Sequence, residues 1–268
     1  MRYLILSLVI LLGLSSTAIS GTRNPRTSDS KHLAYGEKHE CVVQVKGKME
    51  VPYKEGEKQE VMASGSGVII AKRYVLTAAH VVEKTKDPYI ILHGKKIKID
   101  WVLIPKMYKE ANTGPYDIAL CRLDEDAIIG FYPELYGKDD EVGKLCSVAG
   151  WGMYGTWTTG TIYDDNKLRA GSNYISPIMF CGMMVCSVQD KSKRTSLEYL
   201  IGRGDSGGGL FINKKLAGIH SCIYTGDGNL DSSYKDYSAH TRVSLHKPWI
   251  DLIINNYEQI LIEIKEAG

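Results

Sequence analysis

Three short segments carry side chains that together could make a hydroxyl group nucleophilic. Ser206 lies in a glycine-rich segment, residues 204–208. His80 is the last residue of the segment 77–80, and Asp117 directly precedes an apolar run. A serine hydroxyl barely ionises at neutral pH, so it needs a neighbouring base to accept its proton during attack on a carbonyl carbon. His80 is the candidate base, and Asp117 would bind its other ring nitrogen and stabilise the imidazolium. The chemistry that these residue types favour is acyl transfer.

The glycines beside Ser206 indicate a second feature of such a site. The backbone N–H groups of Gly204 and Ser206 are the candidate oxyanion-hole donors, and a Cβ atom at position 204 would hamper the turn that aims them. Each segment alone has a simpler explanation, because Gly, Asp and Ser are common in ordinary turns and both His80 and Asp117 could be strand-end residues. The occurrence of all three in the order His, Asp, Ser favours the catalytic interpretation.

From about Cys41 to its end the chain resembles the trypsin/chymotrypsin-like serine peptidases. The resemblance is carried by the segments around the three candidate catalytic residues, a Gly-Trp-Gly segment and a candidate substrate-pairing strand: residues 75–80, 117–120, 204–209, 149–152 and 218–221. It implies an all-β chymotrypsin-like fold and a secreted serine endopeptidase that hydrolyses peptide bonds through an acyl-enzyme intermediate. Residues 64–68 and 80–82 are more similar to bacterial secreted members of the family than to vertebrate digestive ones.

The resemblance also implies where a substrate would bind. The substrate-binding residues that it assigns are Leu200, Ile201, Ser221, Ile223 and Ser238. Leu200 would lie at the base of the specificity pocket, which argues against lysine or arginine before the cleaved bond, and Ile223 in place of glycine would narrow the mouth. We therefore expect a preference for small or medium aliphatic residues at that position. Asp190 or Glu198 could enter the pocket instead, and Ser221 would in addition support the aspartate of the triad.

Several cysteines of the family are missing. The cysteine after the active-site histidine is Val81 here, its usual partner position is Gly65, and Gly202 and Ile212 replace two others. The six cysteines that are present stand at positions 41, 121, 146, 181, 186 and 222. An even number in an exported chain suggests disulfides, but six cysteines allow about 15 connectivities, so the pairing stays open. The sequence has no CxxC pair, so we expect no zinc site. Acyl transfer by a serine requires neither a metal nor an organic cofactor, and none is expected.

The first 20 residues are typical of a secretory signal peptide. Arg2 supplies the positive charge, and residues 4–14 form an apolar core. Residues 15–20 contain the small side chains that are typical of a signal-peptide cleavage site. The apolar run is shorter than the ~20 residues that span a bilayer, which favours cleavage after Ala18 or Ser20 over a membrane anchor. We expect a secreted protein, extracellular or periplasmic.

The charge of the chain gives little reason to propose a charged partner. The 33 Lys and Arg residues nearly balance the 31 Asp and Glu residues. Neither nucleic acid nor an anionic membrane is therefore expected as a partner. A protein or peptide substrate and a monomeric chain are the expectation.

Two starts of the mature chain are open. Cleavage after Ala18 would leave a start at Ile19 that resembles the Ile-Val-Gly-Gly start of the family, and its amine could pair with Asp205. Such a partner matters because a buried carboxylate without a cation is costly. Cleavage after Ser20 would instead leave residues 21–40 as a mobile N-terminal arm. An internal Arg or Lys would then form the ion pair with Asp205.

Short β-rich runs separated by turns must position these residues. The first set lies at 41–45, 67–70, 89–92, 98–104 and 118–123, and the second at 145–149, 176–179, 209–212, 217–220 and 238–243. Their lengths and spacing predict a barrel or sandwich, and the resemblance implies two six-stranded antiparallel barrels, at about 41–130 and 143–246 of a peptidase domain 41–268. His80 and Asp117 would come from the first barrel and Ser206 from the second. Apolar residues at helical spacing predict a C-terminal helix over 247–267 with Pro248 in its first turn.

Two other functions are compatible with these residues. One is a catalytically silent trypsin-like binding module. Ile223 and Val81, which depart from the family pattern, are compatible with a blocked substrate cleft in such a module. The other is an esterase that uses the same three side chains. Labelling of Ser206 by an organophosphate separates the first from an enzyme, and a comparison of ester with amide turnover separates the second.

Overall fold

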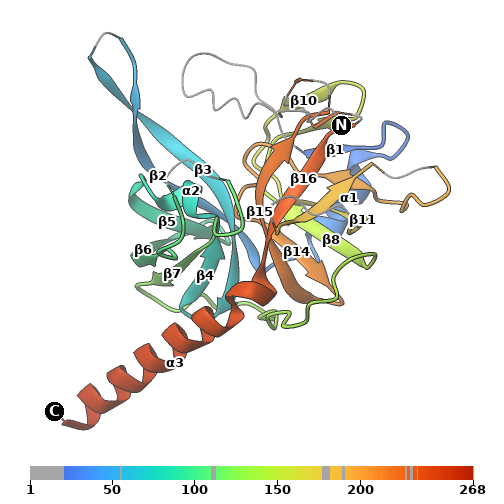
Figure 1. The fold of residues 1–268 in the computed structure, drawn as a ribbon. Helices are drawn as coiled ribbons and strands as arrows, with labels where there is room; N and C mark the ends of the chain where they lie inside the picture. Colours follow the sequence, from blue (N-terminus) through green and yellow to red (C-terminus); the bar gives the residue numbers. More distant parts are fainter. Residues whose placement is uncertain are drawn as a thin grey trace, which may run out of the picture.

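The computed structural model describes the chain from residue 21 to residue 267, except for residues 55, 110–112, 177–181, 189–190, 227, 230–231 and 234. Two bodies of antiparallel strands lie side by side, and a long C-terminal helix extends away from them (Figure 1). Among the described helices, none combines the length and the low polarity that a bilayer span needs.

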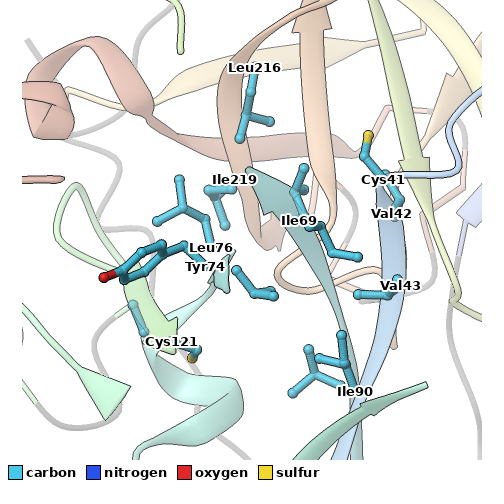
Figure 2. Close-up of a cluster of buried hydrophobic side chains, with 14 of the residues drawn as sticks. Cys41, Val42, Val43, Ile69, Tyr74, Leu76, Ile90, Cys121, Leu216 and Ile219 are labelled. Carbon is cyan, nitrogen blue, oxygen red and sulfur yellow. The ribbon is translucent and has the colours of Figure 1, made fainter. Parts of the chain in front are cut away.

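Six antiparallel strands close the first barrel. Their order around it is β2 (Val42–Pro52), β3 (Lys58–Ala71), β4 (Tyr74–Thr77), β7 (Ala119–Leu123), β6 (Lys95–Leu103) and β5 (Lys86–Leu92). Residues of alternate parity face the interior, as in β6, where Ile97 and Ile99 are buried and Lys98 between them is exposed. Figure 2 shows side chains of this core, including Ile69 and Ile90, pointing toward one another.

The second barrel is a six-stranded antiparallel sheet whose two ends come together. Its strand order is β11 (Arg169–Tyr174), β8 (Leu145–Gly150), β14 (Gly209–Ile212), β15 (Lys215–Tyr224), β16 (Tyr237–Arg242) and β12 (Met184–Ser187). Asn173 Nδ2 of β11 donates to the Ser187 carbonyl of β12 at 3.2 Å, and Ser176 N–H donates to the Val185 carbonyl at 2.8 Å. The predicted all-β fold of two six-stranded barrels followed by a C-terminal helix is confirmed.

The segment before the first barrel is ordered rather than a mobile arm. β1 (Gly21–Arg23) lies in a four-stranded sheet between β9 (Tyr154–Thr156) and β13 (Tyr199–Leu200), with β10 (Gly160–Tyr163) on the outer side of β9. The helix α1 (Asp29–Gly36) follows and packs against β11. Gly36 is needed there, since a Cβ atom would lie 2.5 Å from the Leu168 carbonyl oxygen.

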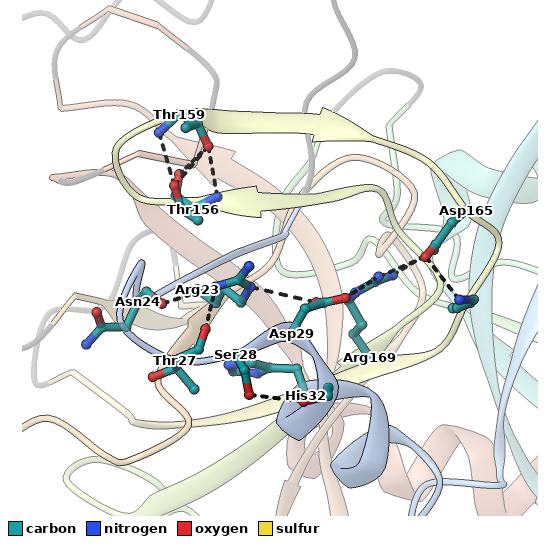
Figure 3. A network of polar contacts seen from close by, with 12 residues as sticks. Arg23, Asn24, Thr27, Ser28, Asp29, His32, Thr156, Thr159, Asp165 and Arg169 are labelled. Carbon is teal, nitrogen blue, oxygen red and sulfur yellow. Dashed lines mark hydrogen bonds and ion pairs between the residues drawn. The ribbon is translucent and has the colours of Figure 1, made fainter.

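A buried arginine fixes this N-terminal segment (Figure 3). The guanidinium of Arg169 is 1% exposed and binds both carboxylate oxygens of Asp29, at 2.9 and 2.8 Å. It also binds both oxygens of Asp165, at 2.8 and 2.9 Å, and lies 3.6 Å from the ring centroid of Tyr154. Arg23 joins the same group through Asp29. Two carboxylates compensate the charge of one buried guanidinium through bidentate hydrogen bonds. Such a network stabilises a fold more than a single exposed ion pair does.

The C-terminal helix α3 (Val243–Ala267) begins before the predicted start at 247. β16 ends at Arg242 and the helix follows without a loop. Pro248 therefore lies inside the helix instead of in its first turn, and one main-chain hydrogen bond cannot form because proline has no N–H. Burial compensates for this loss, since Val243 and Ile250 are completely buried in a core cluster that includes residues of both barrels.

Candidate active site

The short helix α2 (Ala79–Val82) follows β4 and presents His80 at the edge of the first barrel. The ring Nδ1 of His80 lies 2.8 Å from Asp117 Oδ2, and the main-chain N–H of His80 donates to Asp117 Oδ1 at 3.0 Å. Since Nδ1 faces a carboxylate, it carries the proton, and Nε2 is left as an acceptor. The His80 side chain is 26% exposed, whereas Asp117 is fully buried.

The second barrel holds Asp117 from its other side. Ser221 of β15 donates its hydroxyl to Asp117 Oδ2 at 2.5 Å, and the Thr241 hydroxyl of β16 donates to the Asp117 carbonyl oxygen at 3.0 Å. The geometry of the His80–Asp117 pair therefore depends on both barrels. The expected support of Asp117 by Ser221 is present as a direct hydrogen bond.

The electrostatics of His80 follow from the same contacts. Burial opposes protonation, but the charge of Asp117 and its hydrogen bond together outweigh burial, so the pKa of His80 is raised above the usual value. A histidine of this kind is a stronger base than an isolated imidazole, because its protonated form is stabilised by a neighbouring carboxylate.

The turn that carries Ser206 lies against the segment that leads to His80. The N–H of Ser66 donates to the Ser206 carbonyl oxygen at 2.7 Å. Gly207 has a φ of +84°, and a Cβ atom there would lie 2.2 Å from Thr77 Oγ1. Only glycine therefore allows the second-barrel turn to approach the first barrel this closely. The structure brings Ser206, His80 and Asp117 to one junction between the barrels.

Gly204 and Asp205 shape the same turn. Gly204 has a φ of +89°, in the left-handed region that favours glycine. The buried carboxylate of Asp205 accepts hydrogen bonds from Gly152 N–H at 2.8 Å and from Gly202 N–H at 2.9 Å. Burial nevertheless raises the pKa of Asp205 to about 6. Gly204 and Ser206, the candidate oxyanion-hole donors, both lie on this constrained turn.

Asp205 has no cationic partner in the described part of the chain. No Lys or Arg there forms an ion pair with it, so the alternative of an internal cation is not observed. Ile19, the other candidate partner, lies outside the described residues. Gly21, two residues further on, is buried, and a Cβ atom there would lie 2.0 Å from the hydroxyl of Tyr199.

The predicted substrate-binding residues gather on β13, β15 and β16. Leu200 and Ile201 are buried, and Ile201 N–H donates to Ser238 Oγ at 3.0 Å. Ser238 pairs with Ile223 across the two strands, and Ile223 packs against the core of the second barrel. Leu200 also pairs with Thr22 of β1, so the N-terminal strand borders the predicted base of the pocket.

Two contributors to this region were not among the predicted site residues. Ser66 Oγ donates to the Gly204 carbonyl at 2.9 Å and accepts from Trp151 N–H at 2.9 Å, which ties the two barrels at the nucleophile turn. Its sequence signal is the Ser-Gly alternation over residues 64–67. His220 exchanges main-chain hydrogen bonds with the same turn through Gly207 and Gly208, and no local pattern distinguishes it from an ordinary strand residue.

The described cysteines are unpaired, and the described residues contain no cluster of metal ligands. Five cysteines carry free thiols in the structure: Cys41, Cys121, Cys146, Cys186 and Cys222. Cys181 lies outside the described residues. A Cβ atom at Gly65 would lie 2.8 Å from Val81 Cγ1, so these two positions are adjacent and the valine fills the space between them. Within the described ranges, no three His, Cys, Asp or Glu side chains cluster as metal ligands.

Sequence comparisons show which known proteins the chain is similar to. A family model described as Trypsin matches residues 38–250. The chain is 29% identical over 174 residues to a trypsin of Simulium vittatum, a match that covers 58% of this chain and 68% of that protein. It is 28% identical over 204 residues to the snake venom serine protease Haly-2 of Gloydius brevicauda, covering 70% of this chain and 77% of that protein.

A comparison with solved structures gives the same fold. The structure of neuropsin, a serine protease expressed in the limbic system of mouse brain, superimposes with a TM-score of 0.60 at 20% identity. The match covers 82% of this chain and 96% of that one. These relatives are animal proteins, so the closer similarity to bacterial members is not confirmed.

Proposed function

The chain belongs to the trypsin family and is a serine-type endopeptidase, and on this premise we propose that His80, Asp117 and Ser206 form its catalytic triad. The observation that carries the proposal is the 2.8 Å contact between His80 Nδ1 and Asp117 Oδ2. This contact leaves Nε2 as the free base, and the Ser206 turn is held at the same junction by Ser66. A base oriented by a buried carboxylate is the requirement for activating a serine hydroxyl.

The reaction follows from these positions. Nε2 of His80 accepts the proton of Ser206 Oγ as that oxygen attacks the carbonyl carbon of a peptide bond. The N–H groups of Gly204 and Ser206 bind the negative oxygen of the tetrahedral intermediate, and the loss of one such donor typically lowers the rate by about 10²–10³-fold. His80 then protonates the leaving amine. Water hydrolyses the acyl-enzyme by the same steps, with His80 again acting as the base.

Replacement of Ser206 by alanine tests this assignment. Peptide hydrolysis by Ser206→Ala should fall by roughly 10⁴-fold or more, since the nucleophile is removed. Ser30→Ala, at an exposed position on α1, is the matched control and should retain full activity. Undiminished hydrolysis by Ser206→Ala would rule out this triad.

Organophosphate labelling distinguishes the enzyme from the alternatives. Wild-type protein should label at Ser206, and a catalytically silent binding module would stay unlabelled. Turnover of an ester without turnover of the matching amide would instead favour an esterase.

The proposed specificity is for small or medium aliphatic residues before the cleaved bond. The buried side chains of Leu200 and Ile201 and the half-buried side chain of Ile223 support this, because all three are apolar. Cleavage of a peptide library, read by mass spectrometry, is the test. A strong preference for Arg or Lys would contradict the proposal.

The proposed export and maturation concern residues 1–20. They would direct secretion, and cleavage after Ala18 would free the Ile19 amine to pair with Asp205. Support comes from the burial of Asp205, its raised pKa and the docked position of β1 directly downstream. N-terminal sequencing of the secreted protein tests the idea, because any start other than Ile19 excludes the pairing.

A further inference from the structure

Two buried thiols of the second barrel lie next to each other. Cys146 on β8 and Cys186 on β12 have their Sγ atoms 4.0 Å apart. Their residues are 2% and 1% exposed, and both belong to the hydrophobic core of the second barrel. Cys41 and Cys121 are buried as well, but they lie in the other core cluster, with the first barrel. Proximity therefore singles out one pair among the described cysteines.

The position of this pair in the sheet gives it structural importance. β12 is the last strand of the second sheet, and β8 is the second strand from the opposite end. The two strands are not hydrogen-bonded neighbours, so the thiols meet where the sheet closes on itself. The polar contacts at this closure include the hydrogen bond from the Asn173 amide to the Ser187 carbonyl. Asn173 also accepts a hydrogen bond from Cys146 Sγ through its carbonyl oxygen, at 3.2 Å.

We propose that Cys146 and Cys186 form a disulfide that covalently closes the second barrel. The bond requires the Sγ atoms to approach from 4.0 Å to about 2.0 Å. Ile212, which replaces a family cysteine in the resemblance, belongs to the same core cluster. The inference rests on the proposed export of the chain, because disulfides persist mainly in oxidising compartments.

The chemistry is thiol–disulfide exchange with an external disulfide, such as an oxidised protein dithiol or glutathione disulfide. One cysteine loses its proton and attacks that disulfide, which gives a mixed disulfide and releases one thiol. The second cysteine, after loss of its proton, displaces the remaining external sulfur and forms the Cys146–Cys186 bond. Two cysteine thiols are oxidised, and one external disulfide is reduced to two thiols.

The folded barrel is a poor site for this exchange. The hydrogen bond with Cys146 and burial raise the pKa of Cys186 well above its usual value, so little thiolate is present at neutral pH. Burial also excludes an external oxidant. The bond must therefore form before the second barrel closes, and once formed it should resist reductants until the barrel opens.

Peptide mapping of the full chain, secreted from cells and never reduced, tests the pairing directly. Free thiols are alkylated in denaturant, the protein is digested, and the peptides are identified by mass spectrometry. We expect the peptides of Cys146 and Cys186 to be joined, with Cys41 and Cys121 alkylated. Alkylation of both Cys146 and Cys186 would overturn the inference, as would a bond from either of them to Cys181 or to another cysteine.

A thermal measurement gives a second readout. The bond would span 40 positions of sequence, and opening a loop of that size by reduction should lower the Tm by about 10 °C. Cys146→Ala should melt at the same temperature with and without reductant, whereas the control Cys121→Ala should keep the shift. An unchanged wild-type Tm after complete reduction would contradict the proposal. Protein that labels at Ser206 but carries both thiols free would overturn only the disulfide and leave the proposed catalysis standing.

Discussion

Ser221 reaches across the barrel junction to Asp117 with a 2.5 Å hydrogen bond. Hydrogen bonds to charged groups contribute about 1.5–3 kcal/mol. Ser221→Ala should therefore lower kcat by roughly tenfold or more, because Asp117 would hold the His80 ring less firmly. Ser238→Ala is the matched control: it removes the acceptor of Ile201 N–H and should change KM and specificity more than kcat. Steady-state kinetics on one peptide would separate the two, and an unchanged kcat for Ser221→Ala would contradict the assigned role.

The raised pKa of His80 predicts the acid limb of the pH profile. His80 must be neutral to accept the Ser206 proton, so kcat/KM should fall as the pH drops through an apparent pKa above about 6.5. Asp117→Asn removes the charge that outweighs burial, so the apparent pKa should move down and kcat should fall by about 10⁴-fold. The pH dependence of kcat/KM for both proteins is the measurement. An acid limb that does not move in Asp117→Asn would show that another group controls it.

The Arg169 side chain contributes to the docking of β1 and α1. Arg169→Gln would remove the guanidinium from between Asp29 and Asp165, and breaking a buried ion pair typically costs about 3–5 kcal/mol. The Asp29 and Asp165 side chains are partly exposed, at 24% and 26%. We therefore expect a loss of stability near the lower end of this range. Hydrogen exchange over residues 21–36 should accelerate more than exchange in the first barrel.

Lys167→Gln is the matched control for this prediction. Lys167 lies 3.8 Å from the same Asp165 and is 59% exposed, so its loss should change stability by no more than about 0.5 kcal/mol. Equal exchange rates over residues 21–36 in Arg169→Gln and wild-type protein would mean that the arm is held by other contacts.

The strands that the sequence predicts best are those with strong apolar patterns. Apolar runs near 67–70, 118–123 and 209–212 correspond to β3, β7 and β14. β1 spans three residues and gives no such signal, because its hydrogen bonds come from β9 and β13, more than 100 positions away. Local propensity cannot report partners at that separation. The predicted strand at 176–179 lies largely outside the described residues.

The two barrels are interdependent at the candidate site. His80 and Asp117 come from the first barrel, while Ser221 and Thr241 bind Asp117 from the second. The candidate triad residues could be proposed from the sequence because each lies in a short motif. The bridging contacts of Ser66 could not, since they connect segments that only the complete fold brings together.

Acid should destabilise the whole molecule through its buried histidines. Burial lowers the pKa of five of them: His32, His39, His220, His240 and His246. His220 and His240 form a pair with their Nδ1 atoms 2.9 Å apart. The unfolded chain binds protons from about pH 6.5 downward while these folded residues stay neutral, so stability is lost as the pH falls through that window. Asp205 acts in the opposite direction, because its folded pKa of about 6 lets the folded state bind a proton first.

His80, whose pKa is also raised, acts in the same direction as Asp205. The five histidines with lowered pKa values outnumber these two groups, so the net effect should be loss of stability in acid. The pKa values of about 4 for His32 and about 3 for His240 correspond to roughly 3 kcal/mol each by pH 4. Urea unfolding at pH 7, 5.5 and 4.5 would measure this. His32→Gln should flatten the slope, whereas His93→Gln, at an exposed position, should not. A free energy of unfolding that is constant over this range would contradict the prediction.

The interior position of β1 has a practical consequence for producing this protein. Gly21 is packed against the Tyr199 ring between two strands, so an affinity tag fused directly ahead of it would begin beside these strands. The far end of α3 extends away from both barrels (Figure 1). Purification handles and fluorescent labels are therefore best attached at the carboxyl end of the chain, where they meet none of these strands.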